Sequence, residues 1–397
     1  MSSSFEAAKA HFLEGVAHAE AGRHAEAEEA LAASLALLPG RASTLINLGA
    51  VRLRLGKLQA ALAALDQAVA AAPGDLEAWC HRGNACAALG HAADALASFD
   101  RALSIDPGHA GARYQRAVAL HRLGRIGESR SALEALLAND ASLGEAWSLL
   151  GQIHRDEGRA DAAADAFERA IAAGADPAIH AYLLAALRGE AAPEATPPAY
   201  VRALFDDYAE GFDTHLVETL RYRAHSAVVE QACAGTQRRW HDALDLGCGT
   251  GLVGALLRPH VERLHGVDLS PVMVERARAS GHYDTLVADD VVAHLQSTAQ
   301  RHDLIVAADL FIYLGELDAA FAGARRVLEP GGRFVFSVEG VAGEGWLLRP
   351  TLRYGHAEAY LRRLADRHGL AWQGATPCTL REEQRRGVEG LIVRLDG

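Results

Sequence analysis

The sequence predicts two domains of different fold class: an all-α repeat solenoid, and then an α/β domain with a seven-stranded, mostly parallel sheet. Three observations support this prediction. Small residues and prolines recur at a fixed interval through the first part, a proline-rich stretch interrupts the helical pattern at 189–198, and a glycine-rich turn lies within 243–254. At 397 residues, the chain is long enough for two or three domains.

Composition narrows the classes of function. The net charge of −12 argues against non-specific binding to nucleic acid or to an anionic membrane. No run of about 18 apolar residues occurs, so no membrane span is predicted, and the first residues lack the basic and apolar regions of a signal peptide. The five cysteines form no CxxC pair, so we expect a reduced, cytoplasmic compartment and no bound metal.

The fixed interval in the first part is 34 residues. Gly49 returns as Gly83, and Pro73 returns as Pro107. Each unit predicts two helices that approach closely where the residues are small, and the proline ends the second helix. The predicted units are 8–41, 42–75, 76–109, 110–143 (which is degenerate) and 144–177, followed by a capping helix over 178–188.

These units resemble the tetratricopeptide repeat, which implies that a protein or peptide partner binds in a concave groove. Polar residues available to that groove include Asn47, His81 and Asn84. No lysine follows Lys57, so the basic clamp for C-terminal carboxylates is not predicted, and the identity of the groove ligand stays open. The predicted repeat domain spans 1–188.

The residues that follow the repeats change in character. Three prolines and several small residues predict a semi-rigid linker over 189–198, and the second domain is predicted over 199–397. A short polar turn joins its last two predicted strands, so the final strand should be antiparallel. The predicted strands are 242–247, 263–268, 283–288, 303–309, 332–338, 371–379 and 388–395.

The glycine-rich turn is the strongest indication of a binding site. An apolar run containing Asp245 is followed by Gly247, Gly249 and Gly251, and then by a helical pattern. Glycines let the backbone approach a ligand, and the helix N-terminus presents free N–H groups to it. The GxGxxG spacing alone is also found in nicotinamide and flavin enzymes, so other residues must decide between them.

Acidic residues end the next three predicted strands. Asp268 can accept hydrogen bonds from both hydroxyls of a ribose. Asp289 and Asp290 end the third strand, where a carboxylate can accept from an adenine amino group or cap a helix. Asp309 ends the fourth strand, and a Pro-Gly-Gly turn at 330–332 precedes the fifth.

This combination resembles the class I S-adenosylmethionine-dependent methyltransferases, with a Rossmann-like fold, over about 200 residues. A nicotinamide-binding domain would share Asp268 but would need neither Asp245 nor the terminal hairpin. The resemblance implies that Asp245 and the glycine turn hold the methionine portion, that Asp268 binds the ribose, and that Asp290 or Asp289 meets the adenine. The implied cofactor site comprises Asp245, Gly247, Gly249, Gly251, Asp268, Leu269, Asp289, Asp290, Val291, Asp309, Tyr208 and Phe212.

The methyl acceptor is less well defined by the sequence. The motif typical of nucleic-acid amino methylation is absent after Asp309, so nucleic acid is not expected as a substrate. Two segments, 205–215 and 352–360, resemble those of a bacterial group of predicted methyltransferases that carry tetratricopeptide repeats. The first would be a lid over the cofactor, and the second would line the acceptor pocket.

In the acceptor segment, His356 is a candidate base and Arg353 a candidate group to orient an acidic acceptor, with Tyr313 close to the sulfonium. Structural roles are the alternative: a surface or capping position for His356, and packing for Tyr208 and Phe212. The predicted function is methyl transfer to a small-molecule or protein acceptor, with the repeats recruiting a partner or substrate. The alternative is a binding or scaffold protein whose methyltransferase domain is inactive or only senses the cofactor.

Overall fold

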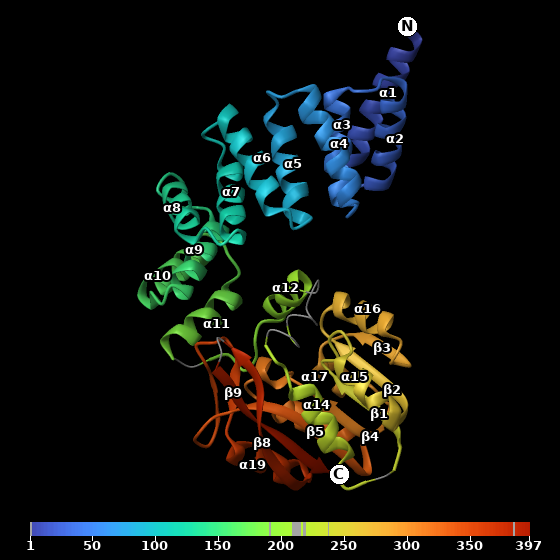
Figure 1. Ribbon diagram of the computed structural model, residues 1–397, viewed down its shortest axis with the longest axis vertical. Helices are drawn as coiled ribbons and strands as arrows, with labels where there is room; N and C mark the ends of the chain where they lie inside the picture. Colours follow the sequence, from blue (N-terminus) through green and yellow to red (C-terminus); the bar gives the residue numbers. More distant parts are fainter. Residues whose placement is uncertain (1, 190–191, 209–215, 217–219, 237, 384–385) are drawn as a thin grey trace. The chain divides into compact units, whose positions relative to one another are not determined.

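The computed structural model describes every residue except 1, 190–191, 209–215, 217–219, 237 and 384–385. By its internal contacts the chain divides into two compact units, Met1–Ala175 and Asp176–Gly397. The first is all-helical and the second is α/β (Figure 1).

The first unit is a series of five helix pairs, as the 34-residue interval predicts (Figure 1). The second helix of each pair packs against the first, and successive pairs also contact each other. The helices are α1 (Ser2–Glu20), α2 (His24–Leu37), α3 (Ala42–Arg54), α4 (Leu58–Ala71), α5 (Leu76–Ala88), α6 (Ala92–Ile105), α7 (Ala110–Arg122), α8 (Ile126–Leu137), α9 (Gly144–Asp156) and α10 (Ala160–Ala172).

The recurring glycine lies where the two helices of a pair touch. A Cβ added at Gly83 would lie 2.5 Å from the ring of Phe99, and one added at Gly49 would lie 2.5 Å from Leu65. A side chain at this position would therefore collide with the large apolar residue of the second helix. This contact explains why a small residue and a large one recur in step.

The helix predicted to cap the repeats belongs to the second unit. Helix α11 (Pro177–Arg188) begins at Asp176, whose carboxylate accepts from the N–H groups of its first turn. Tyr182 on this helix is fully buried, its hydroxyl donates to the Leu352 carbonyl, and its ring lies 5.6 Å from that of Tyr200. These contacts place α11 with the α/β unit, which starts earlier in the chain than the predicted linker.

A single sheet of nine strands forms the centre of the second unit (Figure 1). Strands β3, β2, β1, β4 and β5 run parallel in that order, and β9 pairs antiparallel with both β5 and β8. The predicted antiparallel final strand is thus confirmed. The strands are β1 (Trp240–Leu246), β2 (Val261–Asp268), β3 (Thr285–Ala288), β4 (His302–Ala307), β5 (Leu328–Gly340), β6 (Trp346–Leu348), β7 (Tyr354–His356), β8 (Ala371–Glu383) and β9 (Arg386–Asp396).

Two of these strands were not predicted. The short strands β6 and β7 form an antiparallel hairpin, and β7 pairs in parallel with Glu339 and Gly340 at the end of β5. The predicted count of seven strands is therefore corrected to nine. The added hairpin occupies the region that the sequence assigned to the acceptor pocket.

Helices cover both faces of the sheet. Helices α14 and α15 contribute to one apolar cluster, and α17, α18 and α19 to the other, which holds Phe321, Phe334 and Phe336. The helices are α12 (Pro198–Tyr208), α14 (Ala224–Cys233), α15 (Leu252–Leu257), α16 (Pro271–Ser280), α17 (Val291–Ser297), α18 (Asp318–Val327) and α19 (Glu358–His368), with short 3₁₀ turns at Arg258–His260 and Phe311–Tyr313. Among the described residues, no helix is both long and apolar enough to cross a membrane.

Candidate functional site

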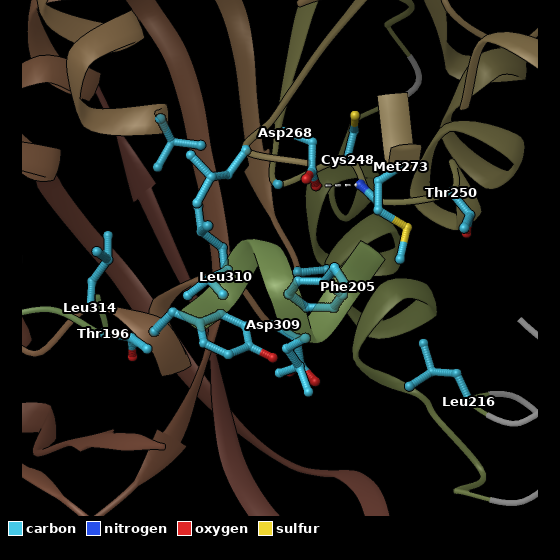
Figure 2. A pocket seen from close by; sticks show the side chains of 18 of the residues that line it. Thr196, Phe205, Leu216, Cys248, Thr250, Asp268, Met273, Asp309, Leu310 and Leu314 are labelled. Atoms are coloured by element: carbon cyan, nitrogen blue, oxygen red, sulfur yellow. Dashed lines mark hydrogen bonds between the residues drawn. The ribbon is translucent and has the colours of Figure 1, made fainter. Parts of the chain in front are cut away.

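A cavity of about 490 Å³ lies where the parallel strands end. Figure 2 shows Asp268 and Asp309 on its wall, with Phe205 of α12 also facing it. The turns after β1, β2, β3 and β4 all contribute lining residues, and most of the lining is apolar. The carboxyl edge of a parallel sheet is where α/β folds usually bind ligands.

The turn after β1 adopts the conformation that its glycines predict. Gly247, Gly249 and Gly251 have φ angles of 69°, 53° and 100°, in the left-handed region that favours glycine. Gly247 and Gly249 line the cavity, whereas a Cβ at Gly251 would face Ser280 at 3.1 Å. Gly251 therefore shapes the turn from behind the cavity wall.

Cys248 within this turn is packed rather than reactive. Its side chain is buried, and a Cβ at Gly266 would lie 3.0 Å from its sulfur. Burial raises the pKa of the Cys248 thiol well above its usual value, so it stays protonated at neutral pH. Cys248 therefore fills space within the turn.

Asp268 is held against the glycine turn. Its Oδ2 accepts from the Gly249 N–H at 2.9 Å, and its Oδ1 accepts from the Ser270 N–H at 2.9 Å. Burial raises the pKa of Asp268, and these two N–H groups oppose that rise. Each oxygen keeps a second lone pair, so the fixed carboxylate can still accept hydrogen bonds from a ligand.

Helix α12 is tied to the same place. Ser270 caps α16 by accepting from the Met273 N–H, and its hydroxyl donates to Asp206 of α12 at 2.6 Å. Phe205, on the same helix, lines the cavity. Of the predicted lid, the described residues bring Phe205 to the cavity wall, while Phe212 and the side chain of Tyr208 lie outside the described residues.

Asp245 lies beneath the turn instead of on the cavity wall. It is fully buried, and its Oδ2 accepts from the Tyr283 hydroxyl at 2.6 Å. That hydroxyl in turn accepts from the Gly254 N–H at 3.2 Å. Burial raises the pKa of Asp245 to about 7. Asp245 thus braces the turn through Tyr283, while its Oδ1 has no hydrogen-bond partner among the described residues, so its contact with a cofactor amino group stays a prediction.

The two acidic residues after β3 differ in their position relative to the cavity. Asp290 and its neighbour Val291 line the cavity, as does Leu269 after β2, whereas Asp289 does not. The Oδ1 of Asp290 caps α17, accepting from the N–H groups of Val292 and Ala293. Asp290 is thus both a helix cap and a cavity residue, whereas Asp289 lies off the cavity and its Oδ1 accepts from the Asp290 N–H, so Asp290 is the better candidate of the two.

Asp309 and Tyr313 line the far side of the cavity. Asp309 has a φ of 53°, an uncommon value outside glycine, and its N–H donates to the Ser337 hydroxyl at 2.8 Å. The Tyr313 ring lies edge-on to Phe205, with centroids 5.6 Å apart. Burial raises the pKa of Tyr313 to about 12, so its hydroxyl is a hydrogen-bond donor at neutral pH.

A buried network of charges supports Asp309. Arg381 is 2% exposed and bonds to Asp309 at 3.0 Å, to Glu383 at 2.7 Å and also to Glu339. Burial by itself would lower the pKa of Arg381. The three carboxylates raise that pKa by more than burial lowers it, so the guanidinium stays charged. Arg353 pairs with Glu383, and both line the cavity.

His356 is not part of this site. It is fully buried in β7, it does not line the cavity, and its Nε2 lies 3.1 Å from the Gly315 carbonyl oxygen. Burial lowers its pKa to about 4. The prediction of His356 as a base is corrected, because pairing of β7 with β5 draws the residue into the sheet.

Sequence reasoning missed several residues of the site. Tyr222, just before α14, and His225, in the first turn of α14, line the cavity with stacked rings whose centroids are 4.8 Å apart. Tyr283, Arg381 and Glu383 come from distant parts of the chain. No local motif marks these residues; only the sheet topology brings them together.

Comparison with known proteins agrees with this architecture. Residues 244–336 match the protein family described as "Methyltransferase domain". Residues 4–42, 46–110, 87–153 and 144–173 match families described as "Tetratricopeptide repeat". The chain combines tetratricopeptide repeats with a methyltransferase domain.

Curated relatives match part of this chain. Nodulation protein S of Rhizobium tropici is 34% identical over 102 residues, which are 24% of this chain and 42% of that protein. The malonyl-[acyl-carrier protein] O-methyltransferase of Hahella chejuensis is 38% identical over 101 residues, 24% of this chain and 36% of that protein. The chain thus spans less than half the length of these relatives.

Two solved structures that resemble this chain each cover less than half of it. The N-methyltransferase NodS from Bradyrhizobium japonicum, in complex with S-adenosyl-L-homocysteine, has a TM-score of 0.36 and 23% identity, covering 44% of this chain and 85% of that chain. A tetratricopeptide protein of Thermus thermophilus has a TM-score of 0.38 and 22% identity, covering 46% of this chain and 100% of that chain.

Proposed function

We propose that the methyltransferase domain binds S-adenosylmethionine in the cavity and transfers its methyl group to a small-molecule or protein acceptor. The observation that carries this proposal is the carboxylate of Asp268, fixed beside the bare backbone of Gly249 on the cavity wall. A fixed carboxylate that can accept hydrogen bonds from two hydroxyls, beside a glycine that leaves the backbone open, suits a ribose and the chain attached to it.

The remaining lining residues fit the other parts of the cofactor. Asp290 and Val291 would hold the adenine, and Asp309 and Tyr313 would lie near the sulfonium. The cavity of about 490 Å³ is large enough for a ligand of this size, since small-molecule sites typically measure about 300–1,000 Å³.

Methyl transfer mainly requires the protein to align the acceptor with the methyl group and the sulfur. S-adenosylmethionine supplies a methyl group on a positively charged sulfur, which an in-line nucleophile displaces. Apolar side chains such as Leu204, Phe205 and Leu310 would keep water out of the cavity. The paired Arg353 and Glu383 offer both a cation and an anion to the polar groups of an acceptor.

An acceptor that reacts in a protonated form needs a base, and we assign that role to His225 in place of His356. His225 lines the cavity, and burial lowers its pKa, so its imidazole is neutral at pH 7 and can take a proton. Replacing His225 by Gln should lower the rate of methyl transfer at unchanged cofactor affinity. An unchanged rate would remove His225 from the mechanism.

The repeats would bring a protein partner or substrate to the enzyme. Five stacked helix pairs form the kind of extended surface on which repeat proteins bind other chains. Deleting the repeats should then abolish methylation of a recruited protein while leaving cofactor binding intact.

Calorimetry with S-adenosylhomocysteine tests cofactor binding. We expect Asp268→Ala to weaken binding by about 30-fold or more, because hydrogen bonds to a charged group contribute about 2 kcal/mol. Asp289→Ala is the matched control, since this neighbouring strand-end acid lies off the cavity and should leave affinity unchanged. Equal effects of the two changes would refute the ribose assignment.

Incubating the full chain with radiolabelled cofactor and cell extract tests catalysis. A labelled product that disappears with Asp268→Ala is expected. Cofactor binding without any labelled product would instead favour a scaffold protein that only senses the cofactor.

A further inference from the structure

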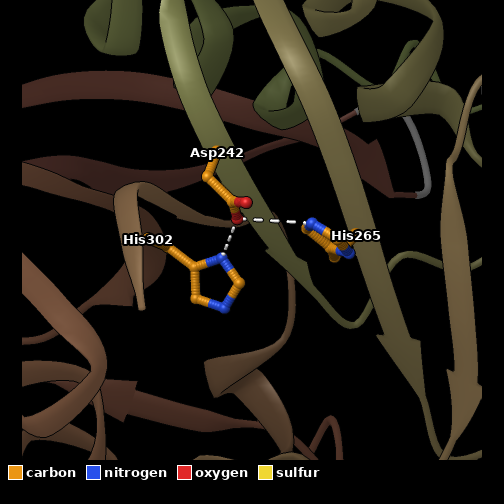
Figure 3. Close-up of side chains that lie close together, drawn as sticks. All are labelled: Asp242, His265 and His302. Carbon is orange, nitrogen blue, oxygen red and sulfur yellow. Dashed lines mark hydrogen bonds and ion pairs between the residues drawn. The ribbon is translucent and has the colours of Figure 1, made fainter. Parts of the chain in front are cut away.

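A second group of chemically active side chains lies away from the cavity, near the amino ends of β1 and β4. Asp242 of β1, His265 of β2 and His302 of β4 come together there (Figure 3). The ligand-type atoms of the three residues all lie within 4.8 Å of one another. The cavity is at the opposite, carboxyl edge of the same strands, so the two sites are separate.

We propose that Asp242, His265 and His302 form a binding site for a divalent zinc ion that holds β1, β2 and β4 together. Two imidazoles and one carboxylate are ligands that Zn²⁺ prefers. The sequence predicts no metal because these ligands are far apart in the chain and only the sheet unites them.

The geometry is close to that of a coordination sphere. Both imidazoles approach the same oxygen, with His302 Nδ1 at 2.6 Å and His265 Nε2 at 3.3 Å from Asp242 Oδ1. Zinc ligands lie about 2.0–2.2 Å from the ion and so about 3.4 Å from each other. The first separation must widen by less than about 1 Å, while the second already fits.

The hydrogen bonds around His265 favour a cation. The Gln300 amide donates to His265 Nε2 at 2.8 Å, which makes that ring nitrogen a lone-pair donor. The same nitrogen lies 3.3 Å from Asp242 Oδ1, so a ring nitrogen and a carboxylate oxygen face each other. For Zn²⁺ to bind this nitrogen the Gln300 amide must turn by 180°, which frees the lone pair of the ring and presents the amide oxygen as a further ligand.

The surroundings also orient the carboxylate. Arg263 Nη2 lies 2.9 Å from Asp242 Oδ2, so it holds the second oxygen and leaves Oδ1 facing the imidazoles. Groups that bond to a ligand in this way usually accompany metal sites. The His265 side chain is 13% exposed and Gln300 is exposed, which gives an ion a short path from solvent.

Zinc binding to the full chain, stripped of metal with a chelator, tests the proposal. We expect about one Zn²⁺ per chain in competition with a zinc-binding dye, and a higher Tm with the ion. Replacing either His265 or His302 by Gln should weaken binding at least about 100-fold, since loss of a group that merely orients a ligand costs about 10–100-fold.

The matched control is His368→Gln. His368 Nε2 lies 3.0 Å from Asp318 Oδ1 and its side chain is 16% exposed, but no second imidazole joins this pair within the described residues. This variant should bind zinc like the wild type. Absence of a stoichiometric site, or equal weakening in all three variants, would overturn the proposal.

X-ray absorption at the zinc edge identifies the ligands of the bound ion in the wild-type protein, without any variant. Two imidazole rings in the coordination shell of the wild-type protein are expected. A shell of oxygen atoms alone would show an adventitious ion and would overturn the proposal even if the histidine variants fail to fold.

Discussion

In the repeats, glycine is needed for space, whereas in the turn after β1 it is needed for backbone conformation. A Cβ at Gly83 would lie 2.5 Å from Phe99, yet Gly83 has ordinary helical geometry. A Cβ at Gly249 would meet nothing within 4 Å, but φ is 53°. The same residue type therefore indicates packing in one unit and a ligand-facing backbone in the other, and only the neighbouring pattern distinguishes them.

The two units also differ in the sequence separation of the residues that contact each other. The repeats pair each helix with its neighbours, whereas the α/β unit joins Arg381 to Asp309 and Glu339 across long stretches of chain. Substitutions in the repeats should therefore act locally, and substitutions in the α/β unit should act on distant strands.

The largest effect is expected for Arg381→Met. Removing this guanidinium leaves the largely buried Asp309 without its cationic partner and takes one of two arginine partners from Glu339, which should cost about 3–5 kcal/mol of stability in the α/β unit. Hydrogen exchange in β8 and β9, with urea unfolding, measures the loss. Arg367→Met removes an exposed ion pair with Asp318 and should change little, so similar losses in both variants would contradict the account.

A smaller loss is expected for Gly83→Ala. The added methyl collides with Phe99 and should destabilise the repeats by about 1–3 kcal/mol while leaving affinity for S-adenosylhomocysteine unchanged. Gly74→Ala, where an added Cβ meets nothing within 4 Å, is the control. Unfolding of the repeats, monitored by hydrogen exchange, should distinguish the two variants.

Gly249→Ala should have the opposite effect: a loss of ligand affinity instead of a loss of stability in the repeats. The left-handed φ costs about 1–2 kcal/mol for a residue with a Cβ, and the methyl group enters the cavity, so affinity for S-adenosylhomocysteine should fall about tenfold or more. Gly281→Ala carries similar strain at a φ of 72° but lies off the cavity. Calorimetry should show lost affinity in the first variant alone; equal affinities would refute a ligand role for the turn.

The last expected effect is a dependence of the stability of the α/β unit on pH. The folded-state pKa of Asp245 is about 7, above its usual value of about 3.9, so the folded chain keeps a proton that the unfolded chain has lost. Its contribution to stability should therefore fall as pH rises from about 4 to about 7. Asp245→Asn should remove that fall in urea unfolding at several pH values, and parallel profiles would contradict it.

Local patterns predict much of this molecule. The 34-residue interval predicts the five helix pairs, because each contact such as that of Gly83 with Phe99 repeats within one unit. The seven longer strands and the antiparallel final strand also follow from apolar runs and turns. Strands β6 and β7 do not, because three residues each are too few to form a pattern and their pairing depends on β5.

The site was predictable only where it follows a strand end directly. Asp268, Asp290 and the glycine turn could be located because sequence position alone places them at the carboxyl edge of the sheet. His356 could not be judged, since its burial depends on strand pairing. Arg381 reads as an ordinary strand residue, although its partners lie on other strands.

A crystal structure of the full chain with S-adenosylhomocysteine tests the central claim most directly. The account predicts ribose hydroxyls within hydrogen-bond distance of the Asp268 carboxylate, the adenine beside Asp290 and Val291, and the sulfur facing Asp309 and Tyr313. A ligand bound elsewhere, or one that lies in the cavity without contacting Asp268, would contradict it.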